Sequence, residues 1–196
     1  NNIAQDEVSK GQNYLTSSFK FIKNTVVSDG MRWNGSSGYW PGTSYTLMHI
    51  CARGSKSGAD KNGRIFDGWG INWLSGYHDN AEGSFFHNGW IIVNENDRGT
   101  DENFLICIDR LNRTRSKGYN NSGSVFDSGY QTGAGNSAPS SSNGIGLGSG
   151  QYTGDINSGD GESSKWECIM AACWSGSKSD SDCNTLMNWG YDALYG

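Results

Sequence analysis

The residues best suited to chemistry lie in one aromatic and polar stretch, between positions 68 and 80. Pyranose rings have apolar C–H faces and polar rims, so a surface that binds them combines aromatic rings with amide, carboxylate and imidazole groups. Glycines on both sides of Trp69 indicate an aromatic ring in a turn. The candidate carbohydrate-binding residues are Trp69, Asn72, Tyr77, His78 and Asp79. The alternative places the tryptophans in the core; we prefer it for Trp73 and Trp90 and leave it open for Trp69.

Two acidic stretches have the oxygen-rich composition that calcium favours. The candidate ligands are Asp97, Asp101, Asp155, Asn157 and Asp160. The second stretch has D-x-N spacing, but it lacks the glycine of an EF-hand loop, and Trp166 stands where that loop has its last glutamate. Both stretches also fit solvated turns, and calcium is the one cofactor that the sequence suggests.

The five cysteines fall into two groups. Cys173 and Cys183 bracket a short polar loop, which predicts a disulfide between them that would stabilise the fold by about 2–3 kcal/mol. Cys51, Cys107 and Cys168 lie in apolar, strand-like runs. Two of these three could pair, or all three could be buried thiols; in either case an odd cysteine stays free or bonds to another chain.

Three N-x-S/T sequons bear on the cellular compartment in which the protein folds. They begin at Asn34, Asn112 and Asn120, and each is a candidate site for an N-linked glycan. Disulfide bonds form and persist in oxidising compartments. Together the cysteines and the sequons predict a secreted or lumenal glycoprotein.

Composition and charge exclude two classes of partner. The chain has 196 residues with a net charge of −5, and its densest basic cluster is only Arg110, Arg113, Arg115 and Lys117. A nucleic-acid-binding protein needs a basic face to neutralise phosphates, so we expect no nucleic-acid partner. No apolar run approaches the roughly 18 residues needed to span a membrane, so we expect no membrane span.

The elements that must position these residues are short strands. The chain has 29 glycines and is 12% aromatic, and its short apolar runs alternate with Gly, Ser and Asn turns. Buried strands are expected at residues 45–53 and 104–109, and Asn88-Gly89 between apolar runs predicts a hairpin. The run at 166–174 is long and apolar, which predicts a central strand covered on both faces. Residues 180–194 begin with Asp and Ser and carry spaced apolar residues, which predicts a helix.

These elements predict an all-β fold with a short C-terminal helix. Residues 1–18 are polar and are treated as an N-terminal segment, and residues 19–196 as a single two-sheet antiparallel β-sandwich domain. The stretch from Gly133 to Gly144 is rich in Gly, Ser and Asn and is expected to be a long surface loop within that domain.

The order of these segments resembles a known family. Residues 63–68 (GRIFDG), 72–78 (NWLSGYH), 83–91 (GSFFHNGWI) and 164–170 (SKWECIM) resemble consecutive strands of concanavalin A-like, laminin-G-like domains from algae, protists and marine microbes. The resemblance covers about residues 40–194 and implies a jelly-roll sandwich with a tendency toward glycan binding or cell adhesion. One departure is that Met170-Ala171-Ala172 replaces the segment that carries an acidic residue in the family's last strand.

The resemblance also permits a test for catalysis. Laminarinase-type glycoside hydrolases share this sandwich and carry two glutamates and an aspartate on one strand, where alternate positions bring the carboxylates to one face. The most similar run here starts at Glu95 and Asp97, but neither position 99 nor position 100 is a carboxylate. The three histidines, at positions 49, 78 and 87, belong to no recognisable Ser-His-Asp set, and we expect His49 to be a hydrogen-bonded core residue. We therefore expect a protein that is not an enzyme.

Two classes of function remain. One is an extracellular lectin-like module that binds a glycan or glycoprotein through the aromatic stretch. The other is a structural subunit that packs against copies of itself or within a larger assembly, which the long polar loops and the odd cysteine favour.

Overall fold

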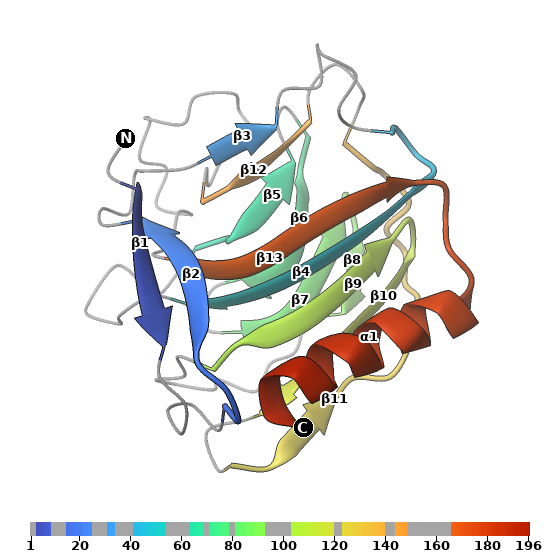
Figure 1. The fold of residues 1–196 in the computed structure, drawn as a ribbon. Helices are drawn as coiled ribbons and strands as arrows, with labels where there is room; N and C mark the ends of the chain where they lie inside the picture. The colour runs from blue at the N-terminus through green and yellow to red at the C-terminus, as the bar shows by residue number, and fades with distance from the viewer. Residues whose placement is uncertain are drawn as a thin grey trace.

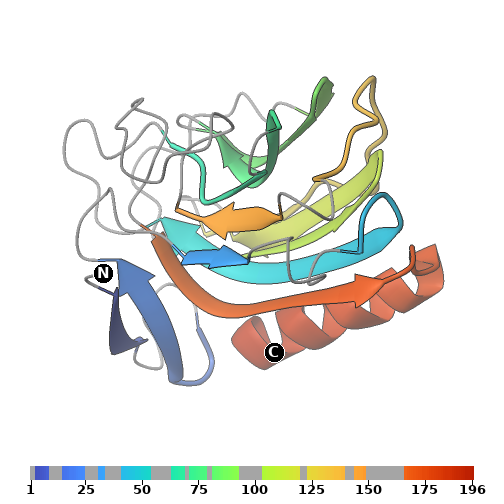
Figure 2. The same cartoon turned by 90° about the horizontal axis from the view of Figure 1, so that it is seen from above.

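The computed structural model describes residues 3–8, 15–24, 31–33, 41–53, 63–68, 71–78, 81–92, 103–119, 123–139, 144–148 and 166–196. These residues form two antiparallel β-sheets and one helix, which lies along one side of the first sheet (Figures 1 and 2). The all-β, two-sheet sandwich with a short C-terminal helix that the sequence predicts is confirmed.

Among the described residues, the first sheet has seven strands and the second has six. Figure 1 shows how these strands are arranged. The first sheet, in spatial order, is β1 (Ile3–Val8), β2 (Phe19–Asn24), β13 (Trp166–Ser175), β4 (Tyr45–Arg53), β9 (Leu105–Arg110), β10 (Arg113–Tyr119) and β11 (Val125–Asp127). The second is β3 (Met31–Trp33), β12 (Ile145–Leu147), β5 (Phe66–Gly68), β6 (Trp73–His78), β7 (Ala81–His87) and β8 (Trp90–Ile92). The helix is α1 (Asp180–Tyr195). Because β1 pairs with β2, this sheet begins within residues 1–18, the segment expected to precede the domain.

Strand β4 lies between two hydrophobic clusters. Tyr45, Leu47 and Cys51 belong to the cluster between the two sheets, whereas Met48 and Ile50 belong to the cluster beneath α1. Side chains alternate across a strand, so a strand covered on both sides is apolar at nearly every position. This is why the predicted buried strand at residues 45–53 is confirmed, with all nine residues buried.

Strand β13 differs from its prediction along its second half. Trp166 and Cys168 are buried in the cluster between the sheets, but Ala171, Cys173 and Ser175 are exposed. The expectation of a central strand covered on both faces is therefore wrong beyond residue 170. An apolar run of small residues does not by itself show that both faces are covered.

The C-terminal helix begins with a complete capping box. The Ser179 side chain accepts a hydrogen bond from the Asp182 N–H, and the Asp182 side chain accepts one from the Ser179 N–H. Met187 and Leu194 pack in the cluster that also contains Met48 of β4. A Cβ placed on Gly190 would lie 2.9 Å from Met48 Cε, so this glycine allows the close approach of helix and sheet.

The densest basic cluster of the sequence anchors the start of α1. Arg110 Nη2 donates to Asp180 Oδ1 at 2.5 Å, and Arg113 donates to both carboxylate oxygens of Asp180. The Tyr130 hydroxyl donates to the Asp180 carbonyl at 3.0 Å, and its ring lies within 5.2 Å of the Arg110 and Arg113 guanidinium groups. The hydrogen bonds from Arg113 and then Arg110 lower the pKa of Asp180 to about 2. These arginines are thus engaged within the fold.

The predicted disulfide between Cys173 and Cys183 is wrong, because all five cysteines are free. Cys173 pairs across the strands with Leu47, whose side chain lies between the two sheets. Cys183 is buried in the cluster beneath α1, on the opposite side of the same sheet. The sheet therefore separates two thiols that are close in sequence.

Candidate functional site

The aromatic stretch predicted to bind a sugar is divided between the core and the surface. Tyr77 is fully buried, and its hydroxyl donates to the Cys51 carbonyl at 2.5 Å, so its assignment to a binding surface is wrong. Asn72 and His78 are half-buried. Trp69 and Asp79 lie outside the described residues. Trp73 is fully buried, as predicted.

A different tryptophan is exposed on the same sheet. Trp90, expected in the core, is 38% exposed at the start of β8. Its ring meets two others edge to face: His78 of β6 at 5.2 Å between centroids and Phe86 of β7 at 4.9 Å. Edge-to-face packing leaves part of the indole available while the neighbouring rings fix its orientation. We call Trp90, His78 and Phe86 the aromatic patch.

The hairpin that carries Trp90 is held by the Gly- and Ser-rich stretch that follows β11. Asn88 has a φ of 56°, and the His87 N–H donates to the Gly89 carbonyl at 2.9 Å, which confirms the Asn88-Gly89 hairpin. The Ala134 N–H donates to the Trp90 carbonyl at 3.3 Å. A Cβ on Gly135 would lie 2.3 Å from the Gly89 carbonyl oxygen, so a glycine is needed for this contact. The described part of the predicted surface loop therefore packs against the aromatic patch's hairpin.

A buried polar network joins the two sheets. Asp109 of β9 accepts a hydrogen bond from the Tyr45 hydroxyl at 2.7 Å and lies 3.1 Å from His87 Nε2. Trp73 Nε1 donates to the Tyr45 hydroxyl at 3.2 Å, and the Asn112 N–H donates to His87 Nδ1 at 3.4 Å. A neutral His87 with its proton on Nε2 satisfies both of its contacts.

This network resembles the parts of a catalytic site without access to a substrate. The Asp109, His87, Tyr45 and Trp73 side chains are all fully buried. Catalytic groups must reach a substrate within hydrogen-bonding distance, directly or through one water. Each of these groups instead bonds to another part of the protein, so the network positions the two sheets relative to each other.

A second buried histidine lies in the core, as predicted. His49 Nε2 lies 3.0 Å from Ser75 Oγ, and its ring lies 4.4 Å from that of Phe66. Its Nδ1 has no hydrogen-bond partner. Burial lowers the pKa of His49 to about 3, so the ring is neutral at physiological pH.

The residues predicted to bind calcium are not among those described. Asp97, Asp101, Asp155, Asn157 and Asp160 all lie in the ranges that the structure leaves out. Within the described ranges, no group of three or more His, Cys, Asp and Glu side chains is placed to hold a metal ion. Calcium binding remains a prediction.

One of the three predicted glycosylation sites is described. Asn112 follows β9, and its Oδ1 accepts a hydrogen bond from the Gly133 N–H at 3.0 Å. Its side chain is half-buried. Asn34 and Asn120 lie outside the described residues. Glycosylation at all three remains a prediction.

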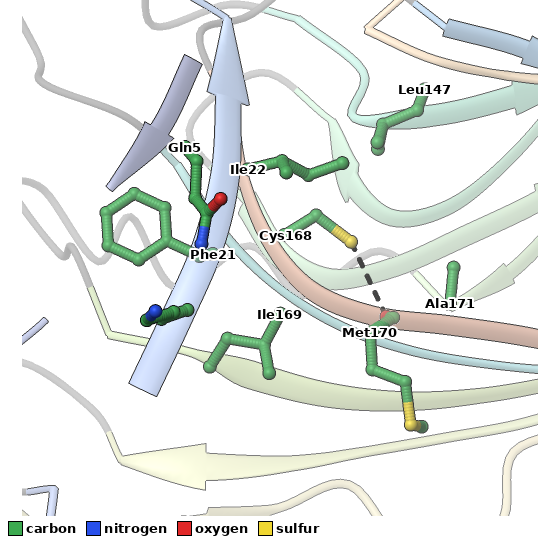
Figure 3. A pocket seen from close by; sticks show the side chains of 9 residues that line it. Gln5, Phe21, Ile22, Leu147, Cys168, Ile169, Met170 and Ala171 are labelled. Carbon is green, nitrogen blue, oxygen red and sulfur yellow. Dashed lines mark hydrogen bonds between the residues drawn. The ribbon is translucent and has the colours of Figure 1, made fainter. Parts of the chain in front are cut away.

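A cavity of about 290 Å³ opens where β2 and β13 diverge (Figure 3). Its lining residues are Gln5, Lys20, Phe21, Ile22, Leu147, Cys168, Ile169, Met170 and Ala171. Its walls are mostly apolar, and the Cys168 thiol donates to the Met170 carbonyl at 3.5 Å. The cavity lies at the interruption in register between Cys168 and Met170.

Comparisons with known proteins leave the function open. No protein-family model matches the chain, and no curated protein matches it. A solved structure of a protein of unknown function from Shewanella oneidensis MR-1 aligns over 91% of this chain and 78% of its own, with 12% sequence identity and a TM-score of 0.43. A similarity at this level supports no inference about function. In the described part of the chain, no helix has the length and apolar character required to cross a membrane.

Proposed function

We propose that the chain is a non-catalytic, extracellular or lumenal carbohydrate-binding module of the concanavalin A-like type, and that it binds sugar through the aromatic patch. The observation that carries the proposal is the exposed Trp90 ring, whose orientation is fixed by His78 and Phe86. His78 belongs to the predicted binding set and contacts this ring.

The aromatic patch offers the two kinds of contact that a sugar requires. The indole of Trp90 presents an apolar surface to the C–H face of a pyranose. The Asn88 side chain is exposed two positions earlier in the hairpin, and its amide can both donate to and accept from hydroxyl groups. A glycan, or the glycan of a glycoprotein, is the partner that this combination fits.

Trp90→Ala is expected to weaken glycan binding by at least about 30-fold, because a central aromatic anchor commonly contributes 2 kcal/mol or more to binding. The melting temperature should change little, since the Trp90 side chain is partly exposed. Binding is measured on a glycan array, followed by titration calorimetry with the best ligand. Trp189→Ala is the matched control, because Trp189 is 54% exposed but lies on α1, and it should bind as the wild type does.

Three outcomes of the array would bear on the proposal. Binding that Trp90→Ala removes and EDTA leaves intact supports the aromatic patch alone. Binding that EDTA also removes supports a calcium-dependent lectin and brings the acidic stretches into the site. A folded chain that binds no glycan contradicts the carbohydrate-binding function.

A second function, that of a self-assembling structural subunit, is favoured by the outer half of β13, whose edge on the β2 side pairs with no other described strand. Among the described strands, β13 pairs with β2 only through Glu167 and Cys168, whereas its pairing with β4 continues to Ser175. Residues 169–175 have the sequence IMAACWS, with no charge and no proline. Sheets usually protect an edge with charges, prolines or bulges. The interruption in register of β13 lies at the start of this segment, between Cys168 and Met170, so the edge from Met170 to Ser175 favours pairing with the same edge of a second copy.

This second function predicts that the purified chain is a dimer and that Ala171→Lys makes it a monomer. Ala171 is exposed, and a lysine on the edge of β13 would oppose strand pairing. Light scattering after gel filtration gives the mass, with Cys173→Ser as the background so that no intermolecular disulfide contributes. Asn188→Lys, at an exposed position of α1, is the control and should stay dimeric. A wild-type monomer at all concentrations rules out this assembly.

A further inference from the structure

Three thiols gather between the sheets on three neighbouring strands. Cys51 of β4, Cys107 of β9 and Cys168 of β13 belong to the same buried cluster, with exposed fractions of 0%, 0% and 5%. The strand order places β4 between β13 and β9. Cys51 is therefore adjacent in the sheet to the strands of both other cysteines.

The strand register distinguishes between the possible pairs. Cys168 lies directly opposite Cys51, whereas Cys107 lies opposite His49 and is diagonal to Cys51. Residues directly opposite on antiparallel strands have Cα atoms about 4.5–5.5 Å apart, within the range of disulfides. Diagonal neighbours are about 7–8 Å apart, and residues two strands apart are separated by about 9–10 Å. Only Cys51 and Cys168 meet the geometric requirement.

We propose that Cys51 and Cys168 are a redox-active pair that closes to a disulfide between β4 and β13 by exchange with small disulfides. Cys168 lies in the wall of the cavity between β2 and β13 and is the more accessible partner (Figure 3). Cys51 lies opposite Cys168 on the neighbouring strand β4 and is fully buried. Burial is the main cause that raises the pKa of Cys51, and a hydrogen bond with Cys168 is the second. Because the thiolate is the reactive form, the disulfide should form faster at alkaline pH.

The reaction is a thiol–disulfide exchange in two steps. The Cys168 thiolate attacks one sulfur of a small disulfide, forms a mixed disulfide and expels the first small thiolate. The Cys51 thiolate then attacks Cys168 Sγ, forms the Cys51–Cys168 bond and expels the second small thiolate. Two protein thiols are oxidised, one small disulfide is reduced to two thiols, and the two protons pass to the released thiolates.

The test uses the whole chain and 2-hydroxyethyl disulfide, a neutral reagent small enough for a cavity of about 290 Å³. After incubation at pH 8.5, remaining thiols are alkylated in denaturant and the digest is mapped by mass spectrometry. We expect one linked peptide pair containing Cys51 and Cys168, with Cys107 alkylated. A link from Cys51 to Cys107, a stable adduct of the reagent on Cys168, or full alkylation of all five cysteines would each overturn the proposal.

Formation of the Cys51–Cys168 disulfide should also raise the thermal stability of the protein. A disulfide that encloses a loop of about a hundred residues restricts the unfolded chain, so the melting temperature should rise by on the order of 10 °C. A reductant should reverse the rise. Cys168→Ala should remove the rise, and Cys107→Ala, an equally buried substitution in the neighbouring strand, should retain it. A similar rise in Cys168→Ala would contradict the assignment.

Discussion

Replacing Asp109 with alanine lowers the free energy of unfolding by about 3–5 kcal/mol, because it removes the carboxylate that two buried donors share. The Tyr45 hydroxyl and His87 Nε2 approach this carboxylate from β4 and β7 at 2.7 and 3.1 Å. In the alanine variant the Nε2–H of His87 points into a dry cavity. Equilibrium denaturation in urea, followed by tryptophan fluorescence, measures the loss.

Asp127→Ala is the matched control for this prediction. Asp127 also accepts hydrogen bonds, two from Arg115 and one from the Gly129 N–H, but it lies on the surface of β11. Exposed ion pairs contribute at most about 1 kcal/mol, so this variant should be close to the wild type. If Asp109→Ala were no more destabilising than Asp127→Ala, the buried network would not be what joins the two sheets.

The Asp109 network also shows where sequence reasoning reaches its limit. Asp109, His87, Tyr45 and Trp73 come from four strands, and no motif or spacing connects them. They meet because β9 and β7 face each other across the sandwich. The sequence can indicate whether each of these residues is buried or exposed. Their hydrogen-bond partners depend on how the two sheets pack, which the sequence does not show.

The secondary structure was most predictable where both faces of an element are buried or capped. The prediction for residues 45–53 is correct because β4 is apolar at most positions, and the prediction for residues 180–194 is correct because Asp and Ser begin the helix and its apolar residues recur at helical spacing. Strand β10 was missed, since its sequence RTRSKGY contains no aliphatic residue. Along β10, long charged side chains that are partly exposed alternate with small buried residues. Both kinds of residue are far from hydrophobic, so a search for alternating hydrophobicity does not find this strand.

The binding surface is only partly predictable from the sequence, although the alternation of side chains along β6 separates core from surface positions. Trp73 was expected in the core, and Tyr77 lies four positions later, which places it on the same side of a regular strand. Its polar neighbours His78 and Asp79 favour the surface instead, and for Tyr77 that prediction is wrong. His78 falls on the opposite side of β6, and Trp90 pairs across from Phe86 of β7. Placing Trp90 required the hairpin register, which the Asn88-Gly89 turn suggests but does not define.

Acidification should destabilise the protein through His49, with a loss of about 1.4 kcal/mol for each pH unit between pH 6.5 and about 3. Burial depresses the pKa of the folded state from an ordinary value of 6.5 to about 3. Above pH 6.5 neither state is protonated, and the full stability is present. Between these two values the unfolded chain binds one more proton than the folded chain, so stability falls as the pH falls.

The prediction is tested by comparing His49→Gln with the wild type, because glutamine does not titrate and can still hydrogen-bond to Ser75. Carboxylates such as Asp180 also lose their contacts in acid, so the informative quantity is the difference between the two proteins at each pH. That difference should grow steadily in favour of the variant from pH 6.5 down to pH 4. If the free energies of unfolding of His49→Gln and the wild type changed in parallel with pH, the pKa of His49 would be the same in the folded and unfolded states, and the prediction would be wrong.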